Sequence, residues 1–340
     1  MSWVPPRLVR RMLVDPLWLP VAAAIAVLLA VLMLVTGVFA PFTRRHRLLR
    51  VAAFASVYLY LDVRLLLTAL WYWLRSPRRH REVRAWRAQH SAALGRALSQ
   101  LINVARSLFG YQVELVGRDL LLDSDNALVV LARHAGPGDS FTLMHLLLGT
   151  LHRNPRVVLK RALQWDPGLD VVLSRLDCYF LPSKSGAGED RAAAVAGLVA
   201  GLTPDDALLL FPEGGNWTPR RHRRSVVRLL RAGKRERARQ VSARSHVLPP
   251  RPGGTSAALA VRDDTDVLVV AHTGLDVLVN PRQMWDALPL DDRPMRIRAW
   301  LHPAPSVPRD DAAIQVWLDG QWALLDQWIG TQQRRGVRLR

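Results

Sequence analysis

An uncharged apolar run at residues 17–40, LWLPVAAAIAVLLAVLMLVTGVFA, limits what this chain can fold into more than any other stretch. A helix rises about 1.5 Å per residue, so a run of this length crosses a hydrocarbon core of about 30 Å. A cleaved signal sequence has a shorter apolar core and ends at small residues, which Pro41-Phe42-Thr43-Arg44 does not supply. We therefore expect a retained transmembrane helix at residues 17–40.

A second apolar run covers residues 51–74 but carries Asp62 and Arg64 near its middle. Charges at that depth of a bilayer are costly unless they are paired or the helix lies near the surface. The run is therefore either the returning half of a helical hairpin or an interfacial helix, with the aromatic residues 71–73 at the level of the lipid headgroups. Together the two runs predict a membrane anchor at residues 1–80.

Arginines flank both apolar runs, and the densest cluster adjoins the long remainder of the chain. Its members are Arg75, Arg78, Arg79 and Arg81. Positive charge is enriched on the cytoplasmic side of membrane segments. We therefore expect the chain to lie at the cell membrane, in a bacterium the inner membrane, with the domain at residues 81–340 facing the cytoplasm.

The charge balance of the whole chain favours anionic partners. The formal net charge is +19, carried mostly by arginine. Such a charge suits nucleic acid or an anionic membrane surface, but the sequence has no recognition helix, zinc finger or aromatic-interleaved basic strand. We therefore expect a phospholipid membrane as partner and no nucleic acid. Cys178 is the single cysteine, which excludes an internal disulfide and a cysteine-based metal cluster, and we expect no metal site.

Beyond residue 81 the pattern alternates between helices and strands. Helices are predicted at 82–109, 141–151, 166–176, 191–202, 225–241 and about 309–332, and strands at 111–116, 127–132, 156–160, 178–181, 207–211, 266–271 and 295–301. This alternation is typical of α/β proteins with a mostly parallel sheet flanked by helices. The C-terminal helix at 309–332 is amphipathic.

The first candidate site lies where the apolar strand at 127–132 ends. His134 follows it, the chain turns through glycine and proline, and a helical pattern restarts at Asp139. Asp139 can hold the imidazole through its Nδ1–H, which leaves Nε2 to accept a proton. The alternative is a surface histidine beside an aspartate that caps a helix. This stretch by itself leaves both interpretations open.

The second candidate site is LLLFPEGGNWTP at residues 208–219, an apolar strand followed by Pro212-Glu213-Gly214. Strand ends of a parallel sheet open onto one edge, so Glu213 can lie near His134 although the two are far apart in the chain. The alternative interpretation is a tight turn that proline and glycine would build in any case.

Taken together, the H-x4-D spacing of His134 and Asp139 and the FPEG run at 211–214 resemble the glycerolipid acyltransferase family, the 1-acylglycerol-3-phosphate acyltransferases. Further pieces match in order: Leu159-Lys160, Tyr179-Phe180-Leu181, Val247 to Arg251 and the tryptophan-rich stretch from Trp317 to Trp322. The sequence departs from the family at Ser183-Lys184, where an arginine is usual, and at Gly215-Asn216, where Thr-Arg is usual.

The resemblance implies a glycerol-3-phosphate acyltransferase-like fold and a specific chemistry. A fatty acyl group would move from acyl-CoA or acyl carrier protein, with no other cofactor, to the free hydroxyl of a lysophospholipid. The leading acceptor is 1-acylglycerol-3-phosphate, which would become phosphatidic acid. His134 would be the base and Asp139 its partner. The residues implied in substrate binding are Glu213, Gly214, Lys160, Lys184, Arg220, Arg221, Pro250 and Arg251.

Three alternatives stay open. The acceptor can be another lysophospholipid or a glycolipid. The run Gly138-Asp139-Ser140 resembles the nucleophile motif of a lipase and esterase class, which would make Ser140 the nucleophile of an esterase or lysophospholipase. That class also needs an aspartate three residues before a histidine, which the chain lacks. The third alternative is a basic membrane protein without enzymatic activity.

Overall fold

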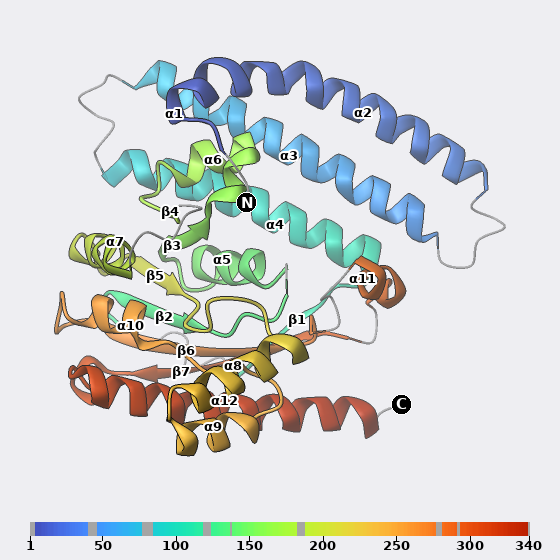
Figure 1. The fold of residues 1–340 in the computed structure, drawn as a ribbon. Helices are drawn as coiled ribbons and strands as arrows, with labels where there is room; N and C mark the ends of the chain where they lie inside the picture. The colour runs from blue at the N-terminus through green and yellow to red at the C-terminus, as the bar shows by residue number, and fades with distance from the viewer. Residues whose placement is uncertain are drawn as a thin grey trace. The chain divides into compact units, whose positions relative to one another are not determined.

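The computed structural model describes residues 4–39, 46–76, 84–117, 124–136, 138–181, 188–276, 281–290 and 293–338 (Figure 1). The chain divides into two compact units. The first unit contains residues 1–111, 144–185 and 288–292, and the second contains residues 112–143, 186–287 and 293–340. The first unit extends past the expected boundary between residues 80 and 81, and that boundary stays a prediction about domain organisation.

Long helices dominate the first unit. A short helix α1 (Arg7–Val9) and a π-helical turn η1 (Arg10–Val14) lead into α2 (Asp15–Val38), followed by α3 (Arg47–Arg75) and α4 (Arg84–Phe109). Figure 1 shows α2, α3 and α4 running side by side. The helical stretches Arg7–Val38 and Arg47–Arg75 are long and apolar enough to cross a membrane. Their most apolar windows are 6% and 33% buried, so α3 packs against protein much more than α2 does.

The charge in the middle of α3 is satisfied inside the first unit. Asp62 is 4% exposed and accepts hydrogen bonds from Nε1 of Trp18 (2.6 Å) and from the backbone N–H of Gly168 (2.8 Å). Trp18 lies on α2, and Gly168 lies on the short buried helix α6 (Pro167–Leu173). Asp62 therefore has hydrogen-bond partners inside the first unit. Whether α3 spans the membrane or lies in the interface stays a prediction.

Two short strands complete the first unit. Strand β3 (Asn154–Lys160) pairs in parallel with β4 (Tyr179–Leu181), and a 3-10 helix (Arg161–Trp165) joins β3 to α6. Asp166 caps α6 by accepting a hydrogen bond from the N–H of Leu169 (3.1 Å). This cap and the proline at the first helical position explain why a helix begins here.

The second unit is built on five strands in the order β1 (Val113–Val116), β7 (Met295–His302), β6 (Asp266–Thr273), β2 (Leu128–Ala132) and β5 (Asp206–Leu210). All pairings in this unit are parallel except β6 with β7, which is antiparallel. Every residue of β2, β5 and β6 is buried, as expected for parallel strands covered on both faces. The prediction of an α/β fold with a mostly parallel sheet flanked by helices is confirmed.

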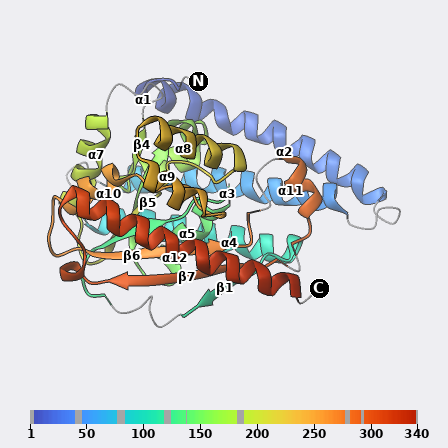
Figure 2. The same ribbon diagram turned by 60° about the horizontal axis from the view of Figure 1, so that its bottom comes forward.

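Helices α7 (Gly188–Ala200), α8 (Pro219–Arg231), α9 (Arg235–Ser242), α10 (Pro252–Leu259), α11 (Pro281–Ala287) and α12 (Asp311–Arg338) belong to the second unit. Helix α5 (Asp139–Gly149) begins in the second unit and ends in the first. The expected C-terminal helix is α12, which lies along β6 (Figure 2). Its side chains Ile314, Leu318 and Leu325 are fully buried, which places the apolar face of this helix in the core.

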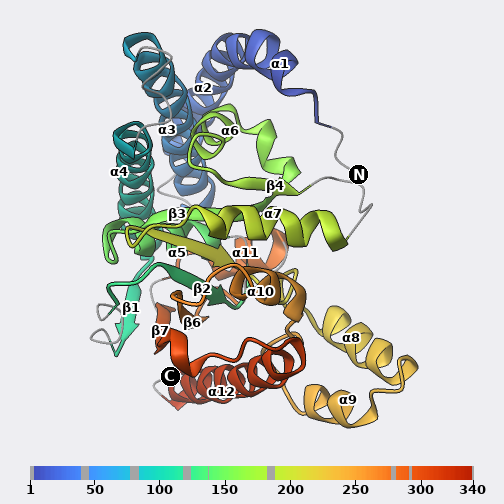
Figure 3. The ribbon, with the colours of Figure 1, turned by 90° about the vertical axis from the view of Figure 1, so that its left-hand side faces the viewer.

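The single basic helix expected at residues 225–241 is wrong. The structure has two helices there, α8 and α9, which pack side by side (Figure 3). The break falls at Gly233, whose φ of +72° is left-handed. Glycine adopts that conformation without steric cost, so it ends a helix that the periodicity alone would continue.

Candidate active site

The end of strand β2 places His134 beside Asp139. The N–H of Arg133 still bonds to the carbonyl of Val270 on β6 (3.3 Å), so the chain leaves the sheet at His134. Nδ1 of His134 lies 2.8 Å from Oδ2 of Asp139, and the two side chains are 15% and 0% exposed. This contact is the one that the sequence predicts for a base with a carboxylate partner. Because Asp139 occupies Nδ1, Nε2 is the nitrogen left to accept a proton.

Two backbone N–H groups also donate hydrogen bonds to the carboxylate of Asp139. Its Oδ2 accepts from the N–H groups of Ala135 (2.8 Å) and Gly136 (3.1 Å). Burial opposes ionisation, but the hydrogen bond with His134 and the nearby His272 outweigh it and keep the pKa of Asp139 below its usual value. A buried, ionised carboxylate with fixed partners orients the imidazole. These N–H groups bond to Asp139 and therefore do not point at a developing oxyanion.

Ser140 also bonds to Asp139. Its backbone N–H lies 2.7 Å from Oδ1 of that carboxylate, and its hydroxyl lies 3.3 Å from the same oxygen. A serine nucleophile needs its hydroxyl to donate to a base such as histidine. This geometry favours a structural role for Ser140 in the first turn of α5.

The loop after strand β5 lies next to His134. Leu131 of β2 is in register with Leu210 of β5 in a parallel pair, so both strands end at the same edge. The ring of Phe211 lies 4.7 Å from the ring of His134 between centroids, with 33° between the planes. The N–H of Trp217 donates to the carbonyl of His134 (2.9 Å). The two candidate stretches therefore form one site within the second unit, as expected from the parallel topology.

Glu213 lies in this loop but points into the protein. It is 2% exposed, and its Oε1 accepts a hydrogen bond from Nε1 of Trp322 on α12 (3.0 Å). Its Oε2 has no hydrogen-bond partner among the described residues. Burial raises the pKa of Glu213 to about 8, although the guanidinium of Arg133 acts against this rise. A direct contact between Glu213 and substrate stays a prediction, and the geometry gives this residue a positioning role.

A cluster of ionisable residues, Arg133, His272 and Asp276, lies next to the site. It was not predicted from the sequence. Arg133 is 1% exposed, donates to the carbonyl of His272 (2.7 Å) and forms an ion pair with Asp276. Burial acts against ionisation of Asp276, but Arg133 outweighs it and lowers the pKa of this carboxyl to about 2. Nε2 of His272 lies 2.9 Å from the carbonyl oxygen of Arg133 and 3.8 Å from Oδ2 of Asp139. The sequence signal that could have indicated this cluster is the position of Arg133 directly after the buried strand β2.

Two arginine side chains pack against glycines of the same loop. A Cβ on Gly214, whose φ is +69°, would lie 3.4 Å from Nη1 of Arg251. A Cβ on Gly215 would lie 2.8 Å from Nη1 of Arg221, which also donates to the carbonyl of Asn216 (3.0 Å). Burial lowers the pKa of Arg251, with the nearby Arg228 adding to the effect. The loop therefore brings together two cations that can bind a phosphate.

The other predicted substrate residues lie in different surroundings. Arg220 is exposed in the first turn of α8, and Pro250 is buried with its carbonyl accepting from Nη2 of Arg237 (2.9 Å). Lys160 is exposed at the end of β3 in the first unit, and Lys184 lies outside the described residues. Within the ranges that the structure describes, no group of three or more His, Cys, Asp or Glu side chains is placed to hold a metal ion.

Comparison with known proteins finds similarity in the central part of the chain. Residues 112–273 match the family model described as Acyltransferase. No curated protein matches the sequence significantly. Among solved structures, the chain is similar to the 1-acyl-sn-glycerophosphate (LPA) acyltransferase PlsC from Thermotoga maritima, with 13% sequence identity and a TM-score of 0.49. That alignment covers 80% of this chain and 98% of the other.

Proposed function

We propose that the protein is an acyltransferase that moves a fatty acyl group from a thioester donor to the free hydroxyl of a lysophospholipid. The match of residues 112–273 to the family model described as Acyltransferase supports this proposal. The observation that carries the proposal is the contact between Nδ1 of His134 and Oδ2 of Asp139, 2.8 Å long. It lies beside the loop whose Gly214 and Gly215 are contacted by Arg251 and Arg221. A base and a phosphate-binding loop are what acyl transfer to a phosphorylated lipid alcohol requires.

The chemistry is direct transfer without a covalent enzyme intermediate. The acceptor hydroxyl oxygen attacks the thioester carbonyl carbon while Nε2 of His134 takes the hydroxyl proton, because a neutral alcohol is a poor nucleophile. Asp139 holds the ring and stabilises the imidazolium that forms. The tetrahedral intermediate then expels the thiolate, which takes the proton from Nε2. The products are the acyl ester and the free thiol.

The loop cations favour an acceptor that carries phosphate. Arg251 and Arg221 flank Gly214 and Gly215, and arginine binds phosphate through two parallel hydrogen bonds. We assign 1-acylglycerol-3-phosphate as the leading acceptor and acyl-CoA or acyl carrier protein as the donor. The two apolar helices, α2 and α3, support a membrane location for this reaction. We assign the site to the cytoplasmic side because the densest arginine cluster adjoins the acyltransferase part of the chain.

The test is acyl transfer by the purified full-length chain in mixed micelles. A labelled acyl-CoA or acyl carrier protein is offered with a panel of lysophospholipids that differ in headgroup. The proposal predicts transfer by the wild type and loss of more than about 1,000-fold in His134→Ala. Transfer at the wild-type rate in that variant would overturn it. Loss of activity in Ser140→Ala with retained activity in His134→Ala would favour the esterase alternative.

A further inference from the structure

A cavity within the first unit lies among its long helices and is lined by none of the residues assigned to acyl transfer. Its volume is about 1080 Å³, the upper end of the range of ligand pockets in proteins. Its walls come from α1, η1 and the start of α2, from the second half of α3, from the start of α4, and from the end of α6 with the turn that follows. The lining includes Arg7, Arg11, Leu19, Leu70, Trp73 and Arg175.

Positive charge exceeds negative charge in the lining. The lining contains Arg7, Arg11, Arg87 and Arg175 but only two carboxylates, Asp15 and Asp177. Arg11 pairs with Asp15 (3.0 Å), and Arg87 pairs with Asp177 (2.9 Å). Behind the wall, the buried Asp170 is matched by Arg10 (2.9 Å) as well as by Arg11 (2.9 Å). The lining therefore carries more arginine than carboxylate side chains.

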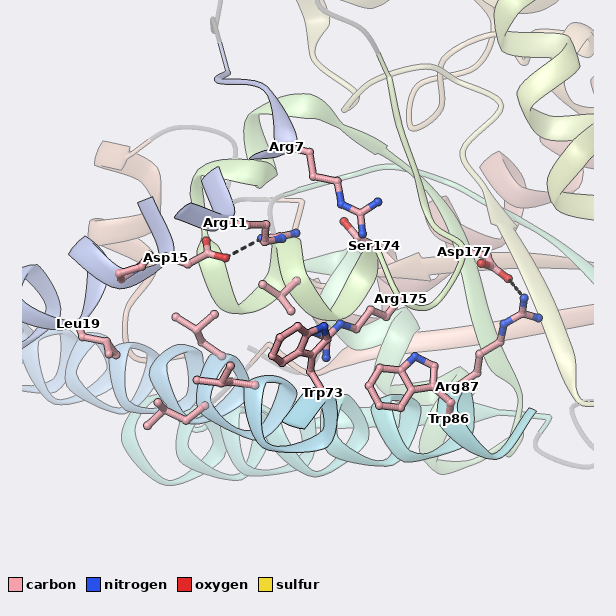
Figure 4. A pocket seen from close by; sticks show the side chains of 15 residues that line it. Arg7, Arg11, Asp15, Leu19, Trp73, Trp86, Arg87, Ser174, Arg175 and Asp177 are labelled. Atoms are coloured by element: carbon pink, nitrogen blue, oxygen red, sulfur yellow. Dashed lines mark hydrogen bonds and ion pairs between the residues drawn. The ribbon is translucent and has the colours of Figure 1, made fainter. Parts of the chain in front are cut away.

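Arg7 and Arg175 differ in how they are held. Arg175 donates to the carbonyl of Ala69 (2.6 Å) and contacts Nε2 of His90 (2.9 Å), which fixes its position. Arg7 is exposed, and among the described residues no ion pair holds its guanidinium. Figure 4 shows its side chain reaching from α1 toward Ser174. Arg7 is therefore placed to bind an anion that enters the pocket.

The remaining wall is apolar and open. Leu19, Leu67 and Leu70 line the pocket although they are 39%, 45% and 48% exposed. Figure 4 shows Leu19 and Trp73 beside the ribbons of α2 and α3, along the wall that faces Arg7 and Ser174. Apolar area of this kind is covered favourably by a hydrocarbon chain. The lining therefore has a cationic side and a hydrocarbon-binding side.

The pocket lies at one end of both apolar helices. Arg7, Arg11 and Leu19 belong to the beginning of the first apolar stretch, and Leu70 and Trp73 belong to the end of the second. Tryptophan and arginine side chains are enriched where a helix meets the lipid headgroups. A ligand at this level of a bilayer is a lipid with its phosphate near the surface and its chain directed inward.

We propose that this pocket binds an amphiphile with an anionic phosphate headgroup and a hydrocarbon chain, the phosphate near Arg7 and Arg175 and the chain along Leu19, Leu67 and Leu70. The bound molecule is a lipid of the membrane and not free phosphate, because the apolar wall has no use in binding an inorganic ion. None of these residues takes part in the proton transfer assigned to His134. The binding therefore does not depend on the proposed acyl transfer.

The experiment is native mass spectrometry of the full-length chain in a non-ionic detergent, titrated with monododecyl phosphate. All variants carry the background substitution His134→Ala, so turnover does not interfere. Arg7→Gln and Leu70→Asp each lower the affinity for the probe by about 5- to 20-fold. The matched controls Arg96→Gln and Leu74→Asp, exposed residues of the same unit outside the pocket, leave the affinity within about twofold.

Three outcomes would overturn the proposal. Equal affinity in Arg7→Gln, Leu70→Asp and their controls would show that the probe binds elsewhere. Dodecylphosphocholine has the same chain and a headgroup without net charge. Equal binding of this molecule would show that the pocket does not select an anionic headgroup. Displacement of the probe by inorganic phosphate at millimolar concentration would assign the site to free phosphate. Because the readout is binding in a variant without its base, failure here leaves the acyl-transfer proposal untouched.

Discussion

Nε1 of Trp322 lies 3.0 Å from Oε1 of Glu213, and this hydrogen bond joins the C-terminal helix α12 to the loop after strand β5. Both residues are buried, with Trp322 fully enclosed and Glu213 2% exposed. The loop that carries Glu213 also places Phe211 against His134. A chain of contacts therefore runs from α12 through this loop to the base.

Glu213→Gln should remove a pH dependence of stability. Burial raises the pKa of Glu213 to about 8 in the folded protein from 4.5 in the unfolded chain. Between these values the folded state binds a proton that the unfolded state has released, so the free energy of unfolding falls as the pH rises through this window. Each pH unit there costs up to about 1.4 kcal/mol. Glutamine does not titrate, so the unfolding midpoint of the variant should be less sensitive to pH between 6.5 and 8.

The comparison is best made above pH 6.5 because His272 titrates in the opposite sense. Burial lowers the pKa of His272, so its contribution to stability is lost as the pH falls below 6.5. Glu213→Ala is the matched control, since it leaves Nε1 of Trp322 buried without an acceptor, at a cost of about 1–3 kcal/mol at every pH. An unchanged pH profile in Glu213→Gln would show that the carboxyl is ionised in the folded protein.

The sequence predicts the contacts between residues that are close in the chain well, and the contacts between residues far apart in the chain poorly. His134 and Asp139 are five positions apart at a strand end, so strand and turn signals are enough to bring them together. The contact between Glu213 and Trp322 joins residues separated by 109 positions, and no local pattern contains it. The register of β2 with β5 was predictable only as a shared edge, because parallel strands open on the same side.

Side-chain direction explains the remaining differences. The sequence marks Glu213 as a loop residue, and only the packing of α12 shows that its carboxyl points inward. Arg133 precedes the candidate base, yet an arginine at a strand end is ordinarily exposed. Its burial depends on Asp276, which lies more than a hundred positions later. The sequence contains many arginines between residues 220 and 239, and their pattern does not indicate which of them contacts the glycine loop. In the structure, Arg221 does so.

Asp139→Asn should slow acyl transfer by about 100- to 10,000-fold with little change in the KM for acceptor. The asparagine amide donates toward Nδ1 of His134, which favours the tautomer with its proton on Nε2 and removes the base. The measurement is kcat and KM with labelled acyl-CoA. The circular dichroism spectrum and the unfolding midpoint check that the variant folds. Activity within threefold of wild type would show that Asp139 only caps α5.

Arg251→Gln should raise the KM for a phosphorylated acceptor by about tenfold and leave kcat nearly unchanged. The guanidinium lies over Gly214 in the loop beside His134, where it can bind phosphate in the ground state and transition state alike. A long-chain monoacylglycerol, which lacks phosphate, should show no KM change between wild type and variant. Arg231→Gln, an exposed arginine of α8, is the control. Equal KM increases for both acceptors would contradict a phosphate contact.

Gly168→Ala should destabilise the first unit by about 1–3 kcal/mol. A Cβ at this position would overlap the side-chain and backbone oxygens of Asp62, and the N–H of Gly168 donates to that carboxylate over 2.8 Å. Relief of the overlap requires α6 to move from α3, which weakens the hydrogen bond that satisfies a charge in the middle of an apolar helix. The measurement is thermal unfolding of the full-length chain in detergent. Gly197→Ala on α7, where a Cβ meets nothing within 4 Å, should be neutral or stabilising by about 0.5–1 kcal/mol. Equal midpoints for the two variants would show that α6 does not need its close approach to Asp62.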